Sequence, residues 1–156
     1  MKIRDQLPGD LGWIISVHGE VYTREFGFDA SFETNIADKI VKYFSGTDDF
    51  NKVWIADVEG NRAGSVAVRA LPENVGFVNF VVVLDAYRGK GIANSLMDKV
   101  IEHGKAYGKE KLRLETFSCL VSAREMYKKL GFEIVEANEL DLFSRTMVQE
   151  FWELPL

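Results

Sequence analysis

The apolar positions along the chain follow a helical spacing first and a strand spacing afterwards. Near the N-terminus, two stretches repeat apolar residues every three to four positions, which is typical of amphipathic helices. The first helix is expected to have Asp10 at its N-cap and to end near Gly27, and the second runs from about Ser31 to Ser45. Their apolar residues are Trp13, Ile14, Val17, Val21 and Tyr22 in the first, and Phe32, Ile36, Ile40, Tyr43 and Phe44 in the second.

The rest of the chain is rich in short strands, predicted at residues 2–7, 53–58, 63–70, 75–84, 112–117, 132–135 and 146–154. Residues 75–84 are apolar on both alternating faces apart from Asn79, which indicates a central strand covered by helices on both sides. Further helices are expected at 92–104 and 122–130. The pattern predicts one mixed α/β domain over residues 1–156, with about seven strands and four helices.

A polar loop with two glycines follows the central strand and leads into the third helix. Its sequence is Arg88-Gly89-Lys90-Gly91, and Ile92 then opens the helical pattern. Backbone N–H groups at a helix start have no partners within the helix, and the helix dipole adds partial positive charge there. We therefore interpret this strand–loop–helix unit as a socket for an anion such as phosphate.

Three phosphate-binding patterns compete for this socket. A Walker loop needs Ser or Thr after Gly-Lys, whereas Gly91 follows Lys90 here. The dinucleotide fingerprint needs a third glycine where this chain has Asn94, and it belongs to the first strand of a sheet rather than the fourth. The remaining pattern, Gln/Arg-x-x-Gly-x-Gly/Ala, is met by Arg88, Gly91 and Ala93.

With this pattern the chain resembles the Gcn5-related N-acetyltransferases, the GNAT family. A second stretch supports the resemblance, because Ala123, Tyr127 and the pair Gly131-Phe132 match the family's A-x-x-x-Y-x-x-x-G-F signature. The order of helices and strands is similar over the whole length. The resemblance implies an acyl-CoA N-acyltransferase fold.

A narrower likeness is to the GNAT domain that often follows a MarR-type winged-helix regulator. It is carried by N-terminal residues 8–33 and by the C-terminal stretch Phe151-Trp152-Glu153-Leu154. A chain of 156 residues has no room for a winged helix besides this domain, so we expect only the acyltransferase half.

The resemblance implies that acetyl-CoA is the acetyl donor. It places the pyrophosphate of coenzyme A on the N–H groups of residues 88–94, and the pantetheine arm along the central strand. Many relatives contact coenzyme A through an Asn after the fifth strand, and Ser118 is the candidate substitute here. The implied cofactor-binding residues are Val81, Val82, Val83, Arg88, Gly89, Lys90, Gly91, Ile92, Ala93, Asn94 and Ser118.

Direct transfer to an amine needs a group that accepts the amine proton and a group that protonates the departing thiolate. Tyr127 is the candidate acid, because a phenol with a pKa near 10 can protonate a thiolate whose pKa is about 8.5 or higher. Asn79 stands where some family members place a glutamate, and an amide cannot take a proton. Glu115, on the next strand, is the nearest carboxylate in sequence and the candidate base, and the alternatives are that Glu115 points to solvent and that a water relay takes the proton.

The acceptor pocket is expected at the first two helices. His18, Tyr22 and Glu25 fall on one face of the first helix, and a Tyr/Glu pair suits an ammonium group. Glu33 opens the second helix, and Asn79 joins the set from the central strand. A core role for Tyr22, a solvated role for Glu25 and a structural role for His18 are the alternatives.

The composition argues against several classes of binding partner. The chain is 47% hydrophobic and 28% charged, which is typical of a globular protein, and its net charge of −5 argues against a nucleic-acid-binding surface and weakly favours cationic substrates. Cys119 is the one cysteine, so no disulfide framework and no metal site are expected. No apolar stretch reaches membrane-spanning length. We expect a cytoplasmic protein without a metal, a nucleic-acid partner or a membrane partner.

Two functional hypotheses follow. The first is an N-acetyltransferase that moves acetyl from acetyl-CoA directly to a primary amine of a small molecule or peptide. The alternative is a non-catalytic acyl-CoA-binding module that acts as a sensor or regulatory partner, which the amide at Asn79 keeps open. Homodimerisation through the C-terminal strands is a further expectation, suggested by Phe151 and Trp152.

Overall fold

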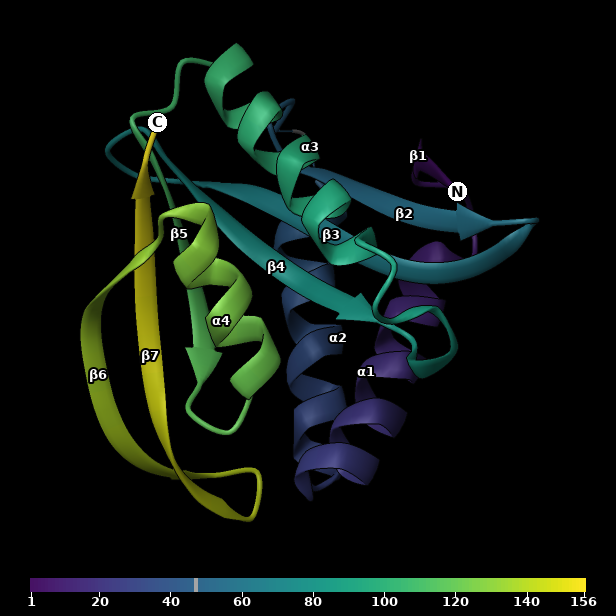
Figure 1. Cartoon of the computed structure of the whole chain (residues 1–156), viewed down its shortest axis with the longest axis vertical. Coiled ribbons are helices and arrows are strands. Elements are labelled where there is room, and N and C mark those ends of the chain that lie inside the picture. Colours follow the sequence, from purple (N-terminus) through teal and green to yellow (C-terminus); the bar gives the residue numbers. More distant parts are fainter. Residues whose placement is uncertain (47) are drawn as a thin grey trace.

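The computed structural model describes residues 1–46 and 48–156, and within these ranges all strands join one seven-stranded sheet (Figure 1). The strand order is β1-β2-β3-β4-β5-β7-β6. The strands are β1 Lys2–Asp5, β2 Lys52–Val58, β3 Asn61–Leu71, β4 Val75–Val83, β5 Lys111–Phe117, β6 Glu133–Leu142 and β7 Arg145–Pro155. The α-helices are α1 Asp10–Phe26, α2 Ala30–Phe44, α3 Ile92–Ala106 and α4 Val121–Leu130, and a short 3-10 turn spans Asp85–Tyr87. The predicted mixed α/β fold is confirmed.

Helices cover both faces of the sheet. In Figure 1, α1 and α2 lie side by side behind it, and α3 and α4 lie in front. Ile14 and Phe32 of the rear helices pack in one core cluster with Phe80 of β4, whereas Leu96 of α3 packs in the other cluster with Val78. The central strand β4 is therefore buried on both faces, as its apolar run predicts.

The strand pairing is antiparallel except at the centre of the sheet. Among the described strands, β4 and β5 form the parallel pair, and the remaining neighbours run antiparallel. The parallel contact covers only residues 75–78 of β4 against 111–114 of β5. Below that contact the two strands separate (Figure 1), and the candidate site lies where they do.

The start of α1 differs from the sequence-based expectation. Gly9 occupies the N-cap, with a φ of 95°, and Asp10 is the first helical residue. The buried Asp10 carboxylate accepts hydrogen bonds from Arg4 at 2.8 Å, from Arg62 at 2.7 Å and from the N–H of Leu7 at 2.7 Å. Two guanidinium groups attract the carboxylate more strongly than the N–H groups of the first helical turn do, because both carry a full charge.

The C-terminal hairpin also differs, since β6 is longer than the predicted strand at 132–135. Most of β6 is exposed at the edge of the sheet, so its sequence has no alternating apolar pattern from which its length could be predicted. Backbone pairing with β7 determines where β6 begins and ends. On β7, Trp152 is buried, and the Arg113 guanidinium lies 4.5 Å from the Phe151 ring. The expected homodimer stays a prediction.

The ion cluster at Asp10 should show itself in the pH dependence of stability. Burial alone would raise the pKa of Asp10, but hydrogen bonds from Arg4, Leu7 and Arg62 outweigh it and lower the pKa from 3.8 to about 2. A carboxyl group with a lowered folded-state pKa stabilises the fold above its unfolded pKa, and this stabilisation is lost as the pH falls toward the folded pKa. Asp10→Asn should therefore lower the free energy of unfolding at neutral pH by about 2 kcal/mol.

Denaturant titrations of both proteins at neutral pH and at about pH 3 measure this effect, and the gap between them should narrow at the lower pH. Equal stability of Asp10→Asn and the parent protein at neutral pH would contradict the assignment.

Candidate active site

A bulge in β4 opens the sheet at its centre. Phe80 and Val81 of β4 together face the single residue Val66 of β3, because the register shifts there. Phe80 has a φ of 56°, which is rare for an aromatic residue, and its carbonyl accepts a 2.6 Å hydrogen bond from the Ser65 hydroxyl. The bulge bends β4 away from β5 immediately after their last paired residues.

The separation leaves a first cavity, here called the donor cleft, with a volume of about 540 Å³. It lies between α1, β4, the socket loop and the start of α4. Within the described residues, Val82 and Val83 pair with β3, and residues 81–83 have no strand partner on the β5 side. The lining residues are Val21, Tyr22, Glu25, Phe26, Val81, Val82, Val83, Arg88, Gly89, Ala93, Cys119, Leu120, Val121, Ser122, Ala123 and Met126.

The socket loop, residues 88–91, forms one end of the donor cleft. Gly89 and Gly91 have left-handed φ values of 76° and 78°, and no atom lies within 4 Å of the position where a Cβ would stand at either residue. Gly91 is the N-cap of α3, so the N–H groups of residues 92–94 have no acceptor within the helix. The Ile92 side chain is buried in the core and offers the socket its N–H alone, whereas Lys90 is exposed.

The Arg88 side chain is bound to α1. Its guanidinium makes two hydrogen bonds to the Glu25 carboxylate, at 2.6 and 2.8 Å, and its Nη1 lies 2.7 Å from Asp85. Its Nε donates a 2.9 Å hydrogen bond to the Val83 carbonyl. The hydrogen bond from Arg88 lowers the pKa of Glu25. Glu25 therefore lines the donor cleft, where it connects α1 to the socket loop.

The segment after β5 reaches the cleft through residues other than Ser118. The Ser118 hydroxyl accepts a 3.1 Å hydrogen bond from the N–H of Val148, and the Ser118 N–H donates to the Val148 carbonyl at 2.9 Å. Cys119 lines the cleft, and burial raises the pKa of its thiol, which disfavours a reactive thiolate. Ser122 and Met126 line the cleft too. Sequence reasoning missed both, although their place in the helix after β5 was a usable signal.

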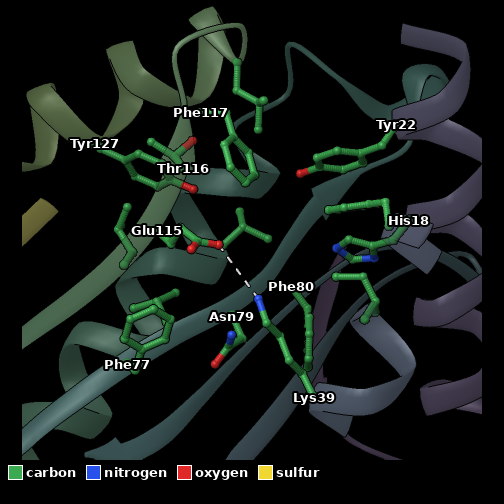
Figure 2. Close-up of a pocket in the computed structure, with 16 residues that line it drawn as sticks. His18, Tyr22, Lys39, Phe77, Asn79, Phe80, Glu115, Thr116, Phe117 and Tyr127 are labelled. Carbon is green, nitrogen blue, oxygen red and sulfur yellow. Dashed lines mark ion pairs between the residues drawn. The ribbon is translucent and has the colours of Figure 1, made fainter. Parts of the chain in front are cut away.

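A second cavity, here called the acceptor pocket, has a volume of about 70 Å³ and lies between the helices α1 and α2 and the strands β4 and β5 (Figure 2). Figure 2 shows β5 and α4 supplying one wall, with Glu115, Thr116 and Tyr127, while α1 and α2 supply the facing wall. The predicted site residues that the pocket brings together are His18, Tyr22, Asn79, Val81, Glu115 and Tyr127.

Two residues of α2 refine the expected acceptor site. Glu33 does not line the pocket, because its side chain lies over Gly19 at the exposed seam between α1 and α2. Lys39 does line it, and its Nζ lies 3.8 Å from Glu115 Oε1 (Figure 2). Sequence reasoning missed Lys39. The available signal was its position three residues after the buried Ile36, which places both on one helix face.

The aromatic groups in the pocket are uncharged at neutral pH. Burial lowers the pKa of His18 to about 4, although the hydrogen bond between Nδ1 and the Ile14 carbonyl, 2.8 Å long, works in the opposite direction. Since a carbonyl can only accept, Nδ1 carries the proton and Nε2 keeps its lone pair. Burial also raises the pKa of the phenols of Tyr22 and Tyr127 far above their ordinary value.

Several polar atoms in the pocket have spare hydrogen-bonding capacity. Glu115 Oε2 accepts a 2.6 Å hydrogen bond from Gln149, which leaves Oε1 facing Lys39. Within the described residues, Asn79 Oδ1 and Thr116 Oγ1 are buried without a hydrogen-bond partner. Buried polar atoms in proteins are nearly always paired with protein groups, water or a ligand, so these two atoms can take a hydrogen bond from a molecule in the pocket.

The donor cleft and the acceptor pocket meet. Tyr22, Val81 and Leu120 line both, so one wall separates the two cavities and the bulge in β4 forms part of it. Tyr127 lines the acceptor pocket (Figure 2). An extended anionic molecule in the cleft could therefore present its end to a small molecule in the pocket, which a phenol and a carboxylate also line.

Among residues 1–46 and 48–156, no group of three or more His, Cys, Asp or Glu side chains is arranged to hold a metal ion. None of the helices in these ranges combines the length and the apolar character that crossing a bilayer requires.

Named relatives share part of this sequence. Human N-acetylaspartate synthetase is 34% identical over 87 residues, which are 55% of this chain but only 29% of that protein. Streptothricin acetyltransferase from Escherichia coli is 25% identical over 150 residues, covering 92% of this chain and 81% of that protein. The chain thus spans less than a third of the first relative and most of the second.

Solved structures share the fold at low sequence identity. Ribosomal-protein-alanine N-acetyltransferase from Brucella melitensis superposes with a TM-score of 0.81 at 17% identity and covers 100% of both chains. The structure of yncA from Salmonella typhimurium with its cofactor acetyl-CoA has a TM-score of 0.76 at 18% identity, covering 100% of this chain and 94% of that one. Residues 19–132 match the Acetyltransferase (GNAT) family, and because they make up well over half of the chain, this protein belongs to that family.

Proposed function

We propose that this protein is an N-acetyltransferase that moves acetyl from acetyl-CoA directly to the primary amine of an acceptor. The observation that carries the proposal is the shared wall of the donor cleft and the acceptor pocket, at Tyr22, Val81 and Leu120. Membership of the acetyltransferase family supports it, as does the acetyl-CoA held by a protein of the same fold. Two adjoining cavities suit direct transfer, because donor and acceptor can then react without a covalent enzyme intermediate.

The residues of the donor cleft fit coenzyme A. The N–H groups of residues 92–94 and the exposed ammonium of Lys90 would hold the pyrophosphate, and the open space at Gly89 and Gly91 would let it approach the backbone. The unpaired side of residues 81–83 would hydrogen-bond the pantetheine amides. Because the Arg88 guanidinium is engaged by Glu25 and Asp85, we assign it the task of fixing the loop rather than binding phosphate as a free side chain.

The residues at the junction can move the protons that the reaction requires. Bound acetyl-CoA supplies an acetyl thioester at the wall between the cavities. Glu115 would accept a proton from the ammonium of the acceptor, which frees the nitrogen lone pair to attack the thioester carbonyl. Tyr127 would donate its O–H to the sulfur as the C–S bond breaks. The raised pKa of Tyr127 keeps this phenol protonated until negative charge develops on the sulfur.

The sensor hypothesis is the alternative to this proposal. It depended on Asn79, which cannot act as a base, and on the lack of the Asn that many relatives carry after the fifth strand. Glu115 lines the same pocket as Asn79, so a carboxylate is available there to act as the base. The narrower likeness to MarR-fused domains and the cytoplasmic location stay predictions.

Tyr127→Phe should lower the turnover number at least about tenfold, because removal of one donor to a developing anion costs that much or more. The affinity for acetyl-CoA should change little, since Tyr127 does not line the donor cleft. Tyr107→Phe, at an exposed tyrosine, is the matched control. Unchanged turnover of Tyr127→Phe in a thiol-release assay would remove Tyr127 from the mechanism.

His18 should stay neutral throughout the range in which enzymes usually work. We expect its imidazole NMR signals to titrate with a pKa of about 4, because burial opposes the charged form. The chain has one other histidine, His103, so Asn or Gln replacement of each residue assigns the signals. The folded protein binds fewer protons than the unfolded chain between pH 4 and 6.5, so His18 should also make stability fall as the pH drops through that window. A His18 pKa near 6.5 would contradict the assignment.

Release of the free thiol should separate the enzyme from the sensor. We expect coenzyme A to be released when acetyl-CoA is supplied with a suitable primary amine, drawn from amino acids, polyamines, aminoglycosides and peptides. Calorimetry of acetyl-CoA binding is the parallel measurement. Tight binding of acetyl-CoA without thiol release on any acceptor would favour the sensor.

A further inference from the structure

The acceptor pocket contains an amine that belongs to the protein itself. Among the described residues that line the acceptor pocket and the donor cleft, Lys39 is the one with a primary amine. Its side chain comes from α2, is partly buried, and directs its Nζ toward Glu115 (Figure 2). The pocket that we expect to receive an acceptor amine therefore already holds one.

The Lys39 ammonium is held only loosely by its neighbours. Its Nζ lies 3.8 Å from Glu115 Oε1, whereas Arg88 approaches Glu25 to 2.6 Å. Charge-assisted hydrogen bonds are normally about 2.7–2.9 Å long, so Lys39 and Glu115 attract each other without forming one. No other ion pair or hydrogen bond binds this ammonium among residues 1–46 and 48–156. A lysine held in this way can still move its nitrogen on a flexible aliphatic stem.

Glu115 is oriented so that it can take a proton from Lys39. Gln149 of β7 donates a 2.6 Å hydrogen bond to Glu115 Oε2, which leaves Oε1 toward Lys39 Nζ. In the proposed reaction, this carboxylate takes a proton from the ammonium of the acceptor. Lys39 and Glu115 form the same pair of ammonium and carboxylate, so the base that prepares an acceptor for attack can also prepare Lys39.

We propose that Lys39 is a self-acetylation site, to which the enzyme transfers acetyl from bound acetyl-CoA when no acceptor occupies the pocket. This inference rests on the proposed function for its chemistry and goes beyond it, because it names a residue of the protein as a substrate. An acetyl thioester that meets an acceptor amine in a pocket of about 70 Å³ also meets the amine that lines this pocket. Because the reaction is intramolecular, the Lys39 amine has a high effective concentration.

The transfer balances without a further reactant. The Lys39 ammonium gives one proton to Glu115, and the nitrogen lone pair then attacks the thioester carbonyl. The C–N bond forms, the C–S bond breaks, and the sulfur leaves as a thiol with the proton of Tyr127. A second nitrogen proton restores Tyr127, and the last one stays on the amide. The products are Nε-acetylated Lys39 and coenzyme A, and Glu115 passes its proton to the solvent.

Acetylation of Lys39 changes both the charge and the free space of the acceptor pocket. It removes the positive charge of Lys39 and so ends the attraction between Lys39 and Glu115. The added carbonyl and methyl groups enter a volume that holds only a few waters. The new amide can hydrogen-bond with Asn79 Oδ1 or Thr116 Oγ1, which are buried and unpaired in the described residues. The acetylated pocket has less room for an acceptor, so the reaction limits itself.

The test incubates the full chain with acetyl-CoA and no added amine. We expect thiol release to stop once it is stoichiometric with the protein, and mass spectrometry of proteolytic peptides should place the acetyl group on Lys39. Lys99 of α3 is the internal control, because it is exposed whereas the Lys39 side chain is only 26% exposed. Free acetyl-CoA favours the exposed amine, but transfer within the pocket should acetylate Lys39 at least about tenfold faster than Lys99.

The matched variants are Lys39→Arg and Lys99→Arg, which keep the positive charge and remove the amine that is acetylated. Lys39→Arg should lose the stoichiometric thiol release, whereas Lys99→Arg should retain it. An excess of coenzyme A is a second control. It should slow acetylation of Lys39 by competing for the donor cleft, and it should leave acetylation of Lys99 unchanged. An added amine that the enzyme acetylates should protect Lys39, because both compete for the same thioester.

The two proposals fail in different ways. Acetylation of Lys39 that is no faster than that of Lys99, or that excess coenzyme A does not slow, would overturn the self-acetylation site. Both comparisons use the parent protein and need no variant. Thiol release on an added amine, with no acetyl group on Lys39 in its absence, would also overturn this site and would uphold the proposed function. Acetylation of Lys39 that coenzyme A slows, without thiol release on any added amine, would uphold the site and overturn transfer to a separate acceptor.

Discussion

The site depends on one backbone distortion, the bulge at Phe80. A regular β4 would continue its pairing with β5 beyond Val78, and the sheet would then be closed where both cavities now lie. The left-handed conformation of Phe80 is unfavourable by itself, and the Ser65 hydroxyl and the packing of the Phe80 ring under α1 and α2 maintain it. Strain at this point is thus balanced by one buried hydrogen bond and a core aromatic contact. The result is a strand with one unpaired edge in the middle of a protein.

The two cavities differ in how their charges are arranged. In the donor cleft, Arg88 and Glu25 neutralise each other through two short hydrogen bonds, so the attraction for an anion comes from backbone N–H groups, the helix dipole and Lys90. In the acceptor pocket, Lys39 and Glu115 stay apart at 3.8 Å and neither is fully satisfied. A tight ion pair fixes structure, whereas a loose one leaves charge for a ligand. The first cavity therefore suits a donor that the backbone N–H groups of the protein hold. The second suits an acceptor whose own charges match those of the pocket.

Burial in the acceptor pocket keeps its reactive groups in defined protonation states. The phenol of Tyr127 remains protonated because its anion would be poorly solvated, and the imidazole of His18 remains neutral for the corresponding reason. His18 then contributes its stacking with Tyr22, at 5.6 Å, and its hydrogen bond to α1 rather than a charge. Glu115 is the carboxylate that lines the pocket among the described residues, which gives it the role of proton acceptor.

The amino-acid sequence by itself determined the elements, the central position of β4 and the socket, because these follow from local periodicity, glycine positions and turn chemistry. It also indicated Tyr127, since a spaced signature marks that helix. The tertiary structure decided which side chains share a cavity. The sequence placed Glu25 and Glu33 in the same expected site as His18 and Tyr22. In the structure, Glu25 binds Arg88 and Glu33 lies over Gly19. In the sequence alone, Lys39 has the pattern of a solvent-exposed lysine. The fold places Glu115 of β5 opposite it. Such pairings join positions far apart in the chain, and the strand divergence that creates them depends on a bulge whose location no local pattern reveals.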